Sequence, residues 1–374
     1  MNYTNIFPVS PQGRQPRSII RVQGAPLPGW VEWEVTNNTH RQTDTFRLVY
    51  AVNQGRYAGE PGLTPAQANQ LMGYSTIGVE ILAGFPNDPV NFSASELQSF
   101  ILGNADGLDF DPVENRIQIS GRDLAAAMVD KKTSEKFVNQ KASDIAKTIA
   151  SRHGLTADID EVPGLDGTFY EIDHTRLNSA SSEWDLLCEL AEDYNCNVWV
   201  DGQTLHFKNA DEPTSGVYTI QWMSPYKARG FPLSNVAHIT FHRNCTLAKN
   251  VQVIVQSWNS KQKKAFTGSA EASKSGAVES QIYTYNEPGL SADQASSRAQ
   301  KRLNAIVNNE MSMSASLPAD NILNARMQVS VTGTGTPFDQ IYYPASVTRH
   351  MSAEGGYTMS FEAKNTMSET ETEE

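Results

Sequence analysis

The residues best suited to bind a metal lie near position 240. His238, His242 and Cys245 offer two imidazoles and a thiolate, which are zinc ligands, and the two histidines share a face because they are four residues apart. On a strand, however, Cys245 has the opposite parity, and no fourth ligand lies nearby in the sequence. We therefore assign no metal site and interpret the two histidines as surface residues of a strand.

Four carboxylates of one polar segment could cleave a glycosidic bond. They are Asp158, Asp160, Glu161 and Asp166. A glycosidase needs two carboxyl groups at a fixed separation in space, which spacing along a polar loop does not establish. A solvated loop explains these residues better, and hydrolysis of peptidoglycan by this segment stays open as a second hypothesis.

Other catalytic patterns are incomplete. The Gly-Thr-Gly at 333–335 has neither the lysine of a phosphate loop nor the helix that follows a dinucleotide fingerprint, and no GxSxG elbow occurs. His153 precedes Gly154 at the end of a helical pattern, where it suits the negative end of a helix dipole. We predict no catalytic residue, no cofactor and no metal.

Length and charge restrict the class of protein. A chain of 374 residues predicts two or three domains. Lys and Arg number 30 against 42 Asp and Glu, so the net charge of −12 disfavours wrapping nucleic acid or docking on an anionic membrane. No stretch approaches 18 uninterrupted apolar residues and the first residues lack a leader pattern, so we expect neither membrane insertion nor a classical export signal.

The cysteines indicate a reducing compartment. Cys188, Cys196 and Cys245 are odd in number and form no CxxC pair, so no disulfide framework is expected. We predict that all three are buried small residues.

Short β-type runs separated by Gly and Pro fill residues 18–120. The runs are 19–22, 30–35, 45–49, 77–82 and 115–119. Many short strands at this spacing predict a barrel or a sandwich. We interpret Trp30, Trp33 and Phe46 as core or edge packing and not as a ligand cage.

Helical periods replace this pattern at Gly121. Apolar residues repeat at intervals of three and four in the segments 122–129, 142–150 and 181–191. Asp201-Gly202 then separates two β runs, and this dipeptide favours a tight hairpin turn. The segment 121–210 is therefore predicted to be an α+β domain.

The β pattern returns after residue 211 with one interruption. The runs are 236–241, 251–255, 281–285, 327–331, 341–347 and 357–361. Ser291-Ala292-Asp293-Gln294 is a capping-box sequence, and Ala295, Ala299 and Leu303 follow it on one helical face. We predict a second β domain with one helix over 211–367, followed by a disordered acidic tail over 368–374.

A lysine-containing segment lies within this second β domain. Lys261, Lys263, Lys264 and Lys274 stand among Ser, Gly and Ala within residues 259–288. Such a composition cannot bury enough surface to order itself alone, so we predict a loop or hairpin that extends from the domain. We interpret its lysines as a partner-contact arm, and the alternative is a solvated loop without a partner.

Three stretches in order resemble the bacteriophage late control gene D proteins, the hub proteins of contractile-tail baseplates. The first is Gly121-Arg122-Asp123-Leu124 with the helix that ends at His153-Gly154-Leu155. The second joins the helix at 178–187 to the hairpin around Asp201-Gly202, and the third is 342–350 with Gly355-Gly356-Tyr357-Thr358. Together they span about two thirds of the chain.

The resemblance implies a fold that is mainly β with an α+β middle: two similar β-barrel hub domains, at 1–120 and 211–367, flank a small helix-and-hairpin domain at 121–210. It implies a homotrimer whose ring of barrels joins a sixfold tail tube to a threefold spike. Type VI secretion relatives continue into a spike, whereas this sequence stops soon after Phe361, so we expect the spike to be another polypeptide.

The resemblance also implies partners and a location. The partners are the spike protein, the tail tube or tube-initiator protein, other baseplate proteins and the tape-measure protein, while DNA passes through the lumen without specific binding. The location is the tail baseplate of the virion, after synthesis and assembly in the host bacterial cytoplasm. We therefore expect a structural protein and not an enzyme, and we rank a carbohydrate-binding adhesin lowest because the aromatic residues lie in predicted strand interiors.

Overall fold

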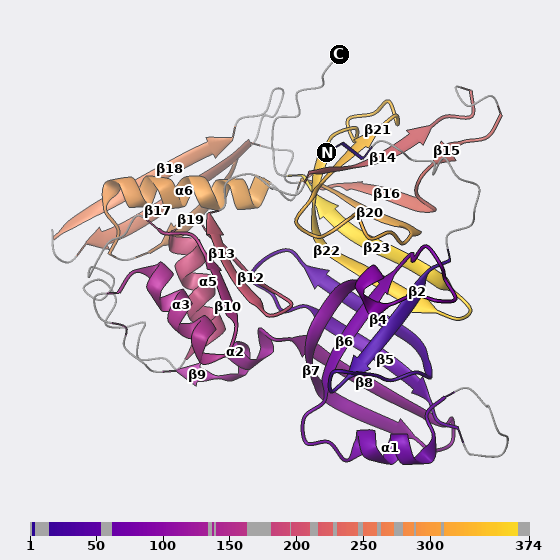
Figure 1. Ribbon diagram of the computed structural model, residues 1–374. Coiled ribbons are helices and arrows are strands. Elements are labelled where there is room, and N and C mark those ends of the chain that lie inside the picture. The colour runs from indigo at the N-terminus through magenta and orange to yellow at the C-terminus, as the bar shows by residue number, and fades with distance from the viewer. Residues whose placement is uncertain are drawn as a thin grey trace.

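A computed structural model describes most of the chain and divides it into a β body and a smaller lobe (Figure 1). The described residues are 2–3, 15–53, 62–133, 137, 140–162, 181–194, 196–209, 216–226, 230–245, 250–259, 263–272, 280–287, 289–307 and 310–365. The predicted acidic tail at 368–374 lies outside them. Within the described residues the fold is mainly β with an α+β middle, as predicted, and one sheet of 15 strands forms the β body.

The first β unit supplies seven strands of this sheet, in the order β4-β5-β8-β7-β6-β2-β3. Their bounds are β2 (Arg17–Val22), β3 (Ala25–Pro26), β4 (Trp30–Asn38), β5 (Thr45–Ala51), β6 (Gly78–Gly84), β7 (Gln98–Asp111) and β8 (Arg116–Asp123). All neighbours are antiparallel, and alternation along the strands places Trp33 and Phe46 in the core, as predicted.

Helix α1 and the long strand β7 of this unit are absent from the sequence-based prediction. Helix α1 (Pro65–Met72) begins with Pro65 at its first turn and Thr64 as N-cap, in a capping box with Gln67. Pro65 was interpreted only as a strand terminator, although Thr-Pro-x-x followed by an apolar period signals a helix start. Strand β7 was missed because Gly103 and Gly107 interrupt its apolar alternation.

The second β unit completes the large sheet. Its strands are β1 (Asn2–Tyr3), β14 (Val217–Met223), β15 (Leu233–Ser234), β16 (His238–Arg243), β20 (Met311–Pro318), β21 (Gln328–Thr332), β22 (Ile341–Ser352) and β23 (Gly356–Lys364). In β20 every second residue is buried, from Met311 through Met313 and Ala315 to Leu317. These side chains belong to the same hydrophobic cluster as Trp33 and Leu48 of the first unit, so the two β units share one core.

The middle segment forms a separate α+β unit. It contains α2 (Ala126–Asp130), β9 (Lys132–Thr133), α3 (Ala142–Arg152), β10 (Thr156–Ile159), β11 (Ser181–Ser182), α5 (Glu183–Asp193), β12 (Cys196–Asp201) and β13 (Thr204–Asn209). The predicted hairpin is confirmed, with Gly202 at φ 54° in the turn between β12 and β13. Helices α3 and α5 pack with this sheet around a core of their own.

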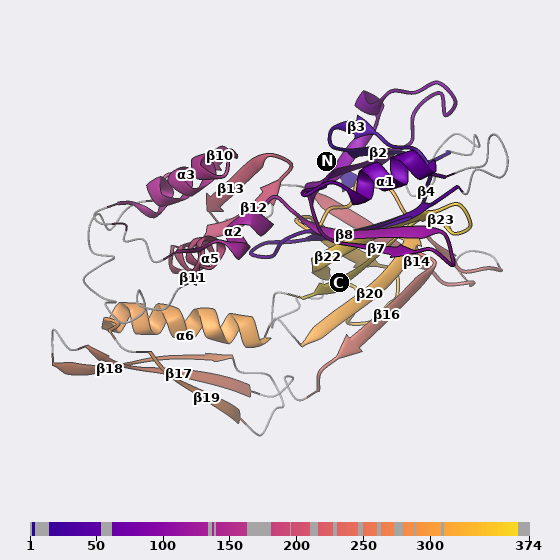
Figure 2. The same ribbon diagram turned by 90° about the horizontal axis from the view of Figure 1, so that it is seen from below.

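A fourth unit corrects the prediction for residues 250–307. Strands β17 (Asn250–Asn259), β18 (Lys264–Ala272) and β19 (Ser280–Asn286) form their own sheet, and α6 (Ala292–Val307) lies across it (Figure 2). The core of this unit is separate, with Val251, Val253 and Val255 against the helix. The sequence analysis placed these residues in the second β domain. They form a separate unit instead, because the valines face α6 and not the core of the large sheet.

The two β units are joined by an antiparallel pairing of β22 with β4. The register runs from Ser346 opposite Asn38 to Ser352 opposite Glu32. Arg349 lies in the middle of this pairing and is only 2% exposed. Its Nε donates to the carbonyl of Asp320, at 3.3 Å, and another of its nitrogens donates to the carbonyl of Leu323.

The same guanidinium reaches the first β unit. Nη1 of Arg349 donates to Oδ1 of Asn37 at 3.4 Å, and the charge stands 4.4 Å from the centre of the Phe100 ring. Arg349 therefore binds both β units at once, through carbonyl oxygens of one unit and through the Asn37 amide oxygen and the Phe100 ring of the other.

A buried pair of carboxylates connects the first β unit to the α+β unit. The backbone N–H of Asp44 donates to Oδ2 of Asp123 at 3.1 Å, and Oδ1 of Asp123 accepts the N–H of Ala125 at the start of the turn into α2. Burial and the neighbouring charge of Asp44 raise the pKa of Asp123 to about 7, while burial raises the pKa of Asp44 to about 6. Between their ordinary value of 3.8 and these raised pKa values, the two carboxyl groups hold protons that they would release in the unfolded chain.

Arg349→Met should lower the free energy of unfolding by about 3 kcal/mol, because two buried carbonyls lose their donor. Urea denaturation measures the change. Arg47→Met is the control: Arg47 is 38% exposed and pairs with Glu32 at 2.9 Å on the surface, so its loss should cost less than about 1 kcal/mol. Equal costs for the two variants would contradict the role assigned to Arg349.

Asp123→Asn should change how stability depends on pH. The folded-state pKa of Asp123, about 7, lies above its ordinary value of 3.8, so its stabilising contribution is present below about pH 4 and is lost as the pH rises through about 7. Relative to the wild type, the variant should therefore gain about 2–4 kcal/mol between about pH 4 and about pH 8. Urea denaturation at several pH values tests this, and a pH-independent difference would contradict it.

Candidate functional site

The loop between β4 and β5, residues 39–44, contacts the α+β unit, and we call this contact between the two units the joint. The backbone N–H of Arg41 donates to the carbonyl of Val198 at 2.8 Å, and its Nη2 donates to the carbonyl of Cys196 at 3.1 Å. In return, the indole N–H of Trp184 donates to the carbonyl of Arg41 at 3.4 Å. The loop thus extends the edge of β12 and contacts helix α5.

An aromatic stack lies beside this joint. Trp199 stacks on His206 with ring centres 4.6 Å apart, and His40 approaches Trp199 from the loop at 5.2 Å. Arg326 from the second β unit stands 5.2 Å above the same indole. Burial, together with the charges of Arg326 and Arg41, lowers the pKa of His40 to about 4, so this imidazole is neutral at pH 7.

A buried glutamate holds the α+β unit together. Glu183 is fully buried and accepts hydrogen bonds from Arg152 and from Nε2 of His153, with Lys131 at 3.5 Å. Burial acts to raise the pKa of Glu183, but the bonds from His153 and Arg152 outweigh it and hold that pKa below the ordinary value.

His153 has two roles, of which the sequence indicated one. It is the C-cap of α3, as predicted, with Gly154 following at φ 68°. Its bond to Glu183 was missed because the partner is 30 residues away and starts a different helix. No local signal marks such a contact.

The carboxylates considered for hydrolysis are engaged in ion pairs. Lys208 binds Asp158 at 2.5 Å and Asp160 at 3.1 Å, and Lys147 binds Glu161 at 2.5 Å. Hydrogen bonds from Lys208 and Lys147 hold the pKa values of Asp158 and Glu161 below the ordinary range. Asp166 lies outside the described residues.

The metal candidates lie on an exposed strand. His238 and His242 point to the same side of β16, opposite Ser316 and Ser312 of β20. Among the described residues no group of three His, Cys, Asp or Glu is placed to hold a metal ion.

The cysteine prediction was partly wrong. Cys196 is buried, as expected, but Cys188 is half-buried and Cys245 is exposed. Cys245 lies two residues beyond the end of β16, at an exposed position.

The Gly-Thr-Gly at 333–335 forms a turn between β21 and β22. The Asp339 carboxylate accepts the N–H groups of Thr334 and Gly335, at 3.0 and 2.8 Å. Gly333 has φ 96°, and a Cβ there would lie 1.9 Å from the carbonyl oxygen of Trp222. The glycines therefore serve a close backbone approach and not a phosphate.

The Gly121-Arg122-Asp123 motif is the passage from the β body into the α+β unit. A Cβ on Gly121 would lie 2.2 Å from the carbonyl oxygen of Asn104, so only glycine fits. Arg122 pairs with Asp106 of β7 at 2.7 Å and with Asp130 of α2 at 2.9 Å. The motif therefore fixes strand β7 of the first β unit to helix α2 of the α+β unit.

The four lysines divide into two pairs. Lys263 lies in the β17–β18 turn at φ 48°, and Lys264 begins β18 with its ammonium 5.5 Å from the Phe266 ring; both are exposed. Lys261 and Lys274 lie outside the described residues. The β17–β18 hairpin is one of the two forms expected for this segment, and pairing with β17 together with packing under α6 supplies the surface that the segment itself lacks.

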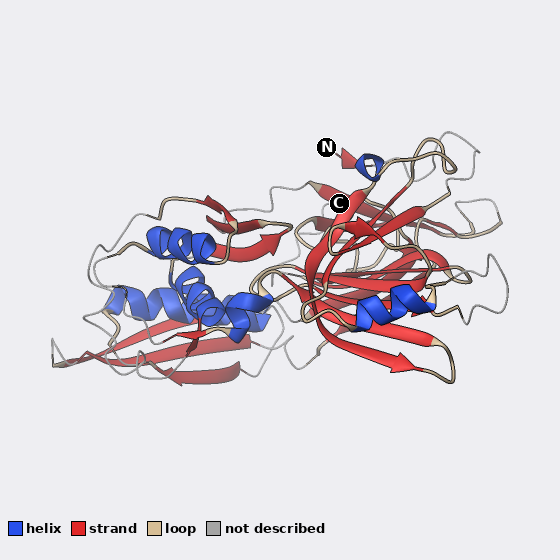
Figure 3. Ribbon diagram, turned by 60° about the horizontal axis from the view of Figure 1, so that its bottom comes forward, coloured by secondary structure: helices blue, strands red, loops and turns tan. Residues whose placement is uncertain are grey.

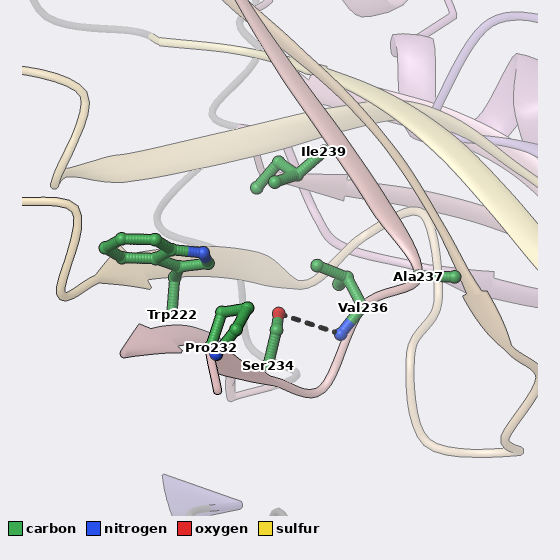
Figure 4. Close-up of a pocket in the computed structure, with 6 residues that line it drawn as sticks. All are labelled: Trp222, Pro232, Ser234, Val236, Ala237 and Ile239. Atoms are coloured by element: carbon green, nitrogen blue, oxygen red, sulfur yellow. Dashed lines mark hydrogen bonds between the residues drawn. The ribbon is translucent and has the colours of Figure 1, made fainter. Parts of the chain in front are cut away.

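Exposed apolar residues gather at the second β unit. A hollow of about 290 Å³ lies where β14, β15 and β16 meet, lined by Trp222, Pro232, Ser234, Val236, Ala237 and Ile239 (Figure 4). Beside it, Tyr226 is 95% and Phe231 81% exposed. These two aromatics were not expected outside strand interiors, and they show that this reason for ranking an adhesin lowest was incomplete.

No helix among the described residues is both long enough and apolar enough to cross a membrane.

Solved structures share this fold over nearly the whole chain. A tail protein from Neisseria meningitidis MC58 aligns with a TM-score of 0.66 and 13% identity, over 94% of this chain and 97% of that one. The 43 kDa tail protein of prophage MuSo2 from Shewanella oneidensis gives 0.64 and 15%, over 94% and 97%. The E. coli c3393 protein, a type VI secretion component, gives 0.52 and 12%, over 94% and 77%.

Sequence comparisons give one family. No curated protein matches this sequence. Residues 105–314 match the family described as the Alg8 N-terminal domain, from within β7 to within β20. The match covers parts of both β units and all of the α+β unit, and its description names no activity. Because it extends over more than half of the residues, the chain belongs to the family described as the Alg8 N-terminal domain, and it has the fold of phage-type tail proteins.

Proposed function

We propose that this chain is a structural hub of a phage-type contractile tail baseplate, a homotrimeric ring that joins the sixfold tail tube to a threefold spike. One observation carries the proposal: two β units are joined edge to edge in a single sheet by β4 and β22. Three such chains would present six β units around one axis, which is the number that a sixfold tube requires. The similarity to the late control gene D hub proteins supports the same assignment.

The pKa values of the carboxyl groups considered for hydrolysis favour a structural hub over a hydrolase. The acid of a glycosidase needs a raised pKa, so that it is still protonated when it meets the leaving oxygen. Asp158 and Glu161 have lowered pKa values instead, because lysines bind them. Among the described residues, the carboxyl groups with raised pKa values are Asp44 and Asp123, which lie in the joint between units.

The proposed assembly implies particular partners and a location for the chain. The spike, the tail tube or tube-initiator protein and other baseplate proteins would bind the ring, and the tape-measure protein and DNA would pass through its lumen. The net charge of −12 suits passage of DNA without specific binding. The chain would act in the virion baseplate after assembly in the bacterial cytoplasm.

The full-length protein should form a homotrimer. Its solution mass should be three times 41.2 kDa, about 124 kDa, because a closed ring of this kind needs cyclic symmetry. Light scattering coupled to gel filtration gives the mass, and negative-stain images should show a ring. A stable dimer would overturn the proposal.

The lysines of the β17–β18 hairpin are proposed as a partner contact. Trypsin should cut the free protein after Lys263, which is exposed in a turn, and more slowly after Lys264, because β18 is paired along its length with β17. In assembled baseplates the cut after Lys263 should be at least about tenfold slower if a partner covers the hairpin. Mass spectrometry of the fragments measures both rates, and equal rates would make the hairpin an ordinary surface element.

A further inference from the structure

A fixed apolar side chain projects from the first β unit. Val90 is 79% exposed in the segment between β6 and the short helix η1 (Ala94–Glu96). The Asp88 carboxylate accepts the backbone N–H groups of Val90 and Asn91, at 2.8 and 3.2 Å, and Pro89 stiffens the turn between them. Nε of Arg17 donates to the carbonyl of Pro89 at 2.8 Å, so the turn is tied to the start of β2.

An apolar hollow that could accept such a side chain lies on the second β unit. Strand β15 pairs with β14, but the chain then turns away and β16 pairs with β20. The Asn235 side chain marks the divergence, because its amide accepts from Gln221 N–H and donates to the carbonyl of Thr219. The hollow shown in Figure 4 lies where β15 and β16 diverge, and most of its lining side chains are apolar.

Both features lie beside strand edges that are open for pairing. Among the described residues no strand pairs with the second edge of β16, and β3 covers the second edge of β2 only at Arg21 and Val22. Exposed edges of this kind are templates for another strand. Figure 2 shows β2 and β3 on the opposite side of the β body from β16, so the two edges of one chain do not meet.

We propose that the turn carrying Val90 inserts into this hollow of a second copy of the chain, with β2 of one copy beside β16 of the next. The proposal rests on the self-assembly proposed above and names the surfaces that make it. It continues, between copies, the sheet that β4 and β22 already join within one chain. A contact between two different surfaces repeats head to tail, and it closes into a ring of three when each copy is rotated by a third of a turn from the last. Burial of the valine would also help to cover Phe231 and Leu233, which are 81% and 43% exposed.

The test is sedimentation of full-length variants over a range of concentrations. Val90→Asp should weaken self-association by about tenfold or more, because a carboxylate would enter an apolar hollow. Ala237→Arg, at an exposed position of the lining, should do the same. The double variant should recover part of the loss, since each contact would then pair an Asp with an Arg.

The chain contains a matched control. Val113 is 88% exposed in a second Asp-Pro-Val turn, where the Asp111 carboxylate accepts the N–H groups of Val113 and Glu114, at 2.8 and 3.0 Å. Val113→Asp makes the same chemical change at the tip of the β7–β8 hairpin and should leave self-association unchanged. Circular dichroism should show all four variants folded, because the altered positions are exposed.

The outcomes separate this contact from the hub proposal. If the wild type self-associates and Val90→Asp has no more effect than Val113→Asp, the contact is wrong and the ring still stands. If the wild type stays a monomer at every concentration, both the contact and the ring fail.

Discussion

The pairing of β4 with β22, with the Arg349 side chain buried at its centre, is the constraint on which the other units depend. It connects residues more than 300 positions apart and merges two β units into one sheet around one core. A guanidinium can be buried there only if its donors are satisfied, and the acceptors come from both units: Asn37 from one, Asp320 and Leu323 from the other. The relative position of the units is therefore fixed by hydrogen-bond geometry as well as by apolar packing, which by itself tolerates sliding.

Strand β4 also determines where the α+β unit lies. Beyond Asn38 the chain leaves the sheet. The Arg41 side chain then donates a hydrogen bond to the carbonyl of Cys196, and its backbone N–H donates to the carbonyl of Val198. The Gly121-Arg122-Asp123 passage also holds these two units together, through Asp106 and Asp130. Figure 3 shows most of the helices gathered in the lobe beside the mainly stranded β body. Two separate sets of contacts resist rotation of the α+β unit against the β body better than one would. The fourth unit is linked to the α+β unit by Arg298, which pairs with Glu192 at 3.3 Å.

Charge and apolar surface are used differently in this molecule. Many carboxylates of the described chain are bound by lysine or arginine, which stabilises the units and leaves few groups with the properties of an acid or a base catalyst. Exposed apolar side chains instead stand at particular places: on the two Asp-Pro-Val turns, around the hollow beside β16, and at Trp258 and Ile282 of the small sheet. These positions suit the contacts between proteins proposed above, because apolar area removed from water supplies much of the free energy of association.

Local patterns determined most elements of this protein, and only the tertiary structure decided how they combine. The apolar periods at 142–150 and 181–191, the glycine at 154 and the Asp201-Gly202 turn act within a few residues, so the sequence alone predicted α3, α5 and the β12–β13 hairpin. Residues 250–307 were assigned to the second β domain, whereas they have a sheet and a core of their own, because alternation shows that a strand has a buried face but not what buries it. The partners of Arg349, Glu183 and Asp123 could not be predicted either, since each contact joins elements that are distant in sequence. Such contacts depend on strand order and register, and these are set by the packing of the whole core and not by any one segment.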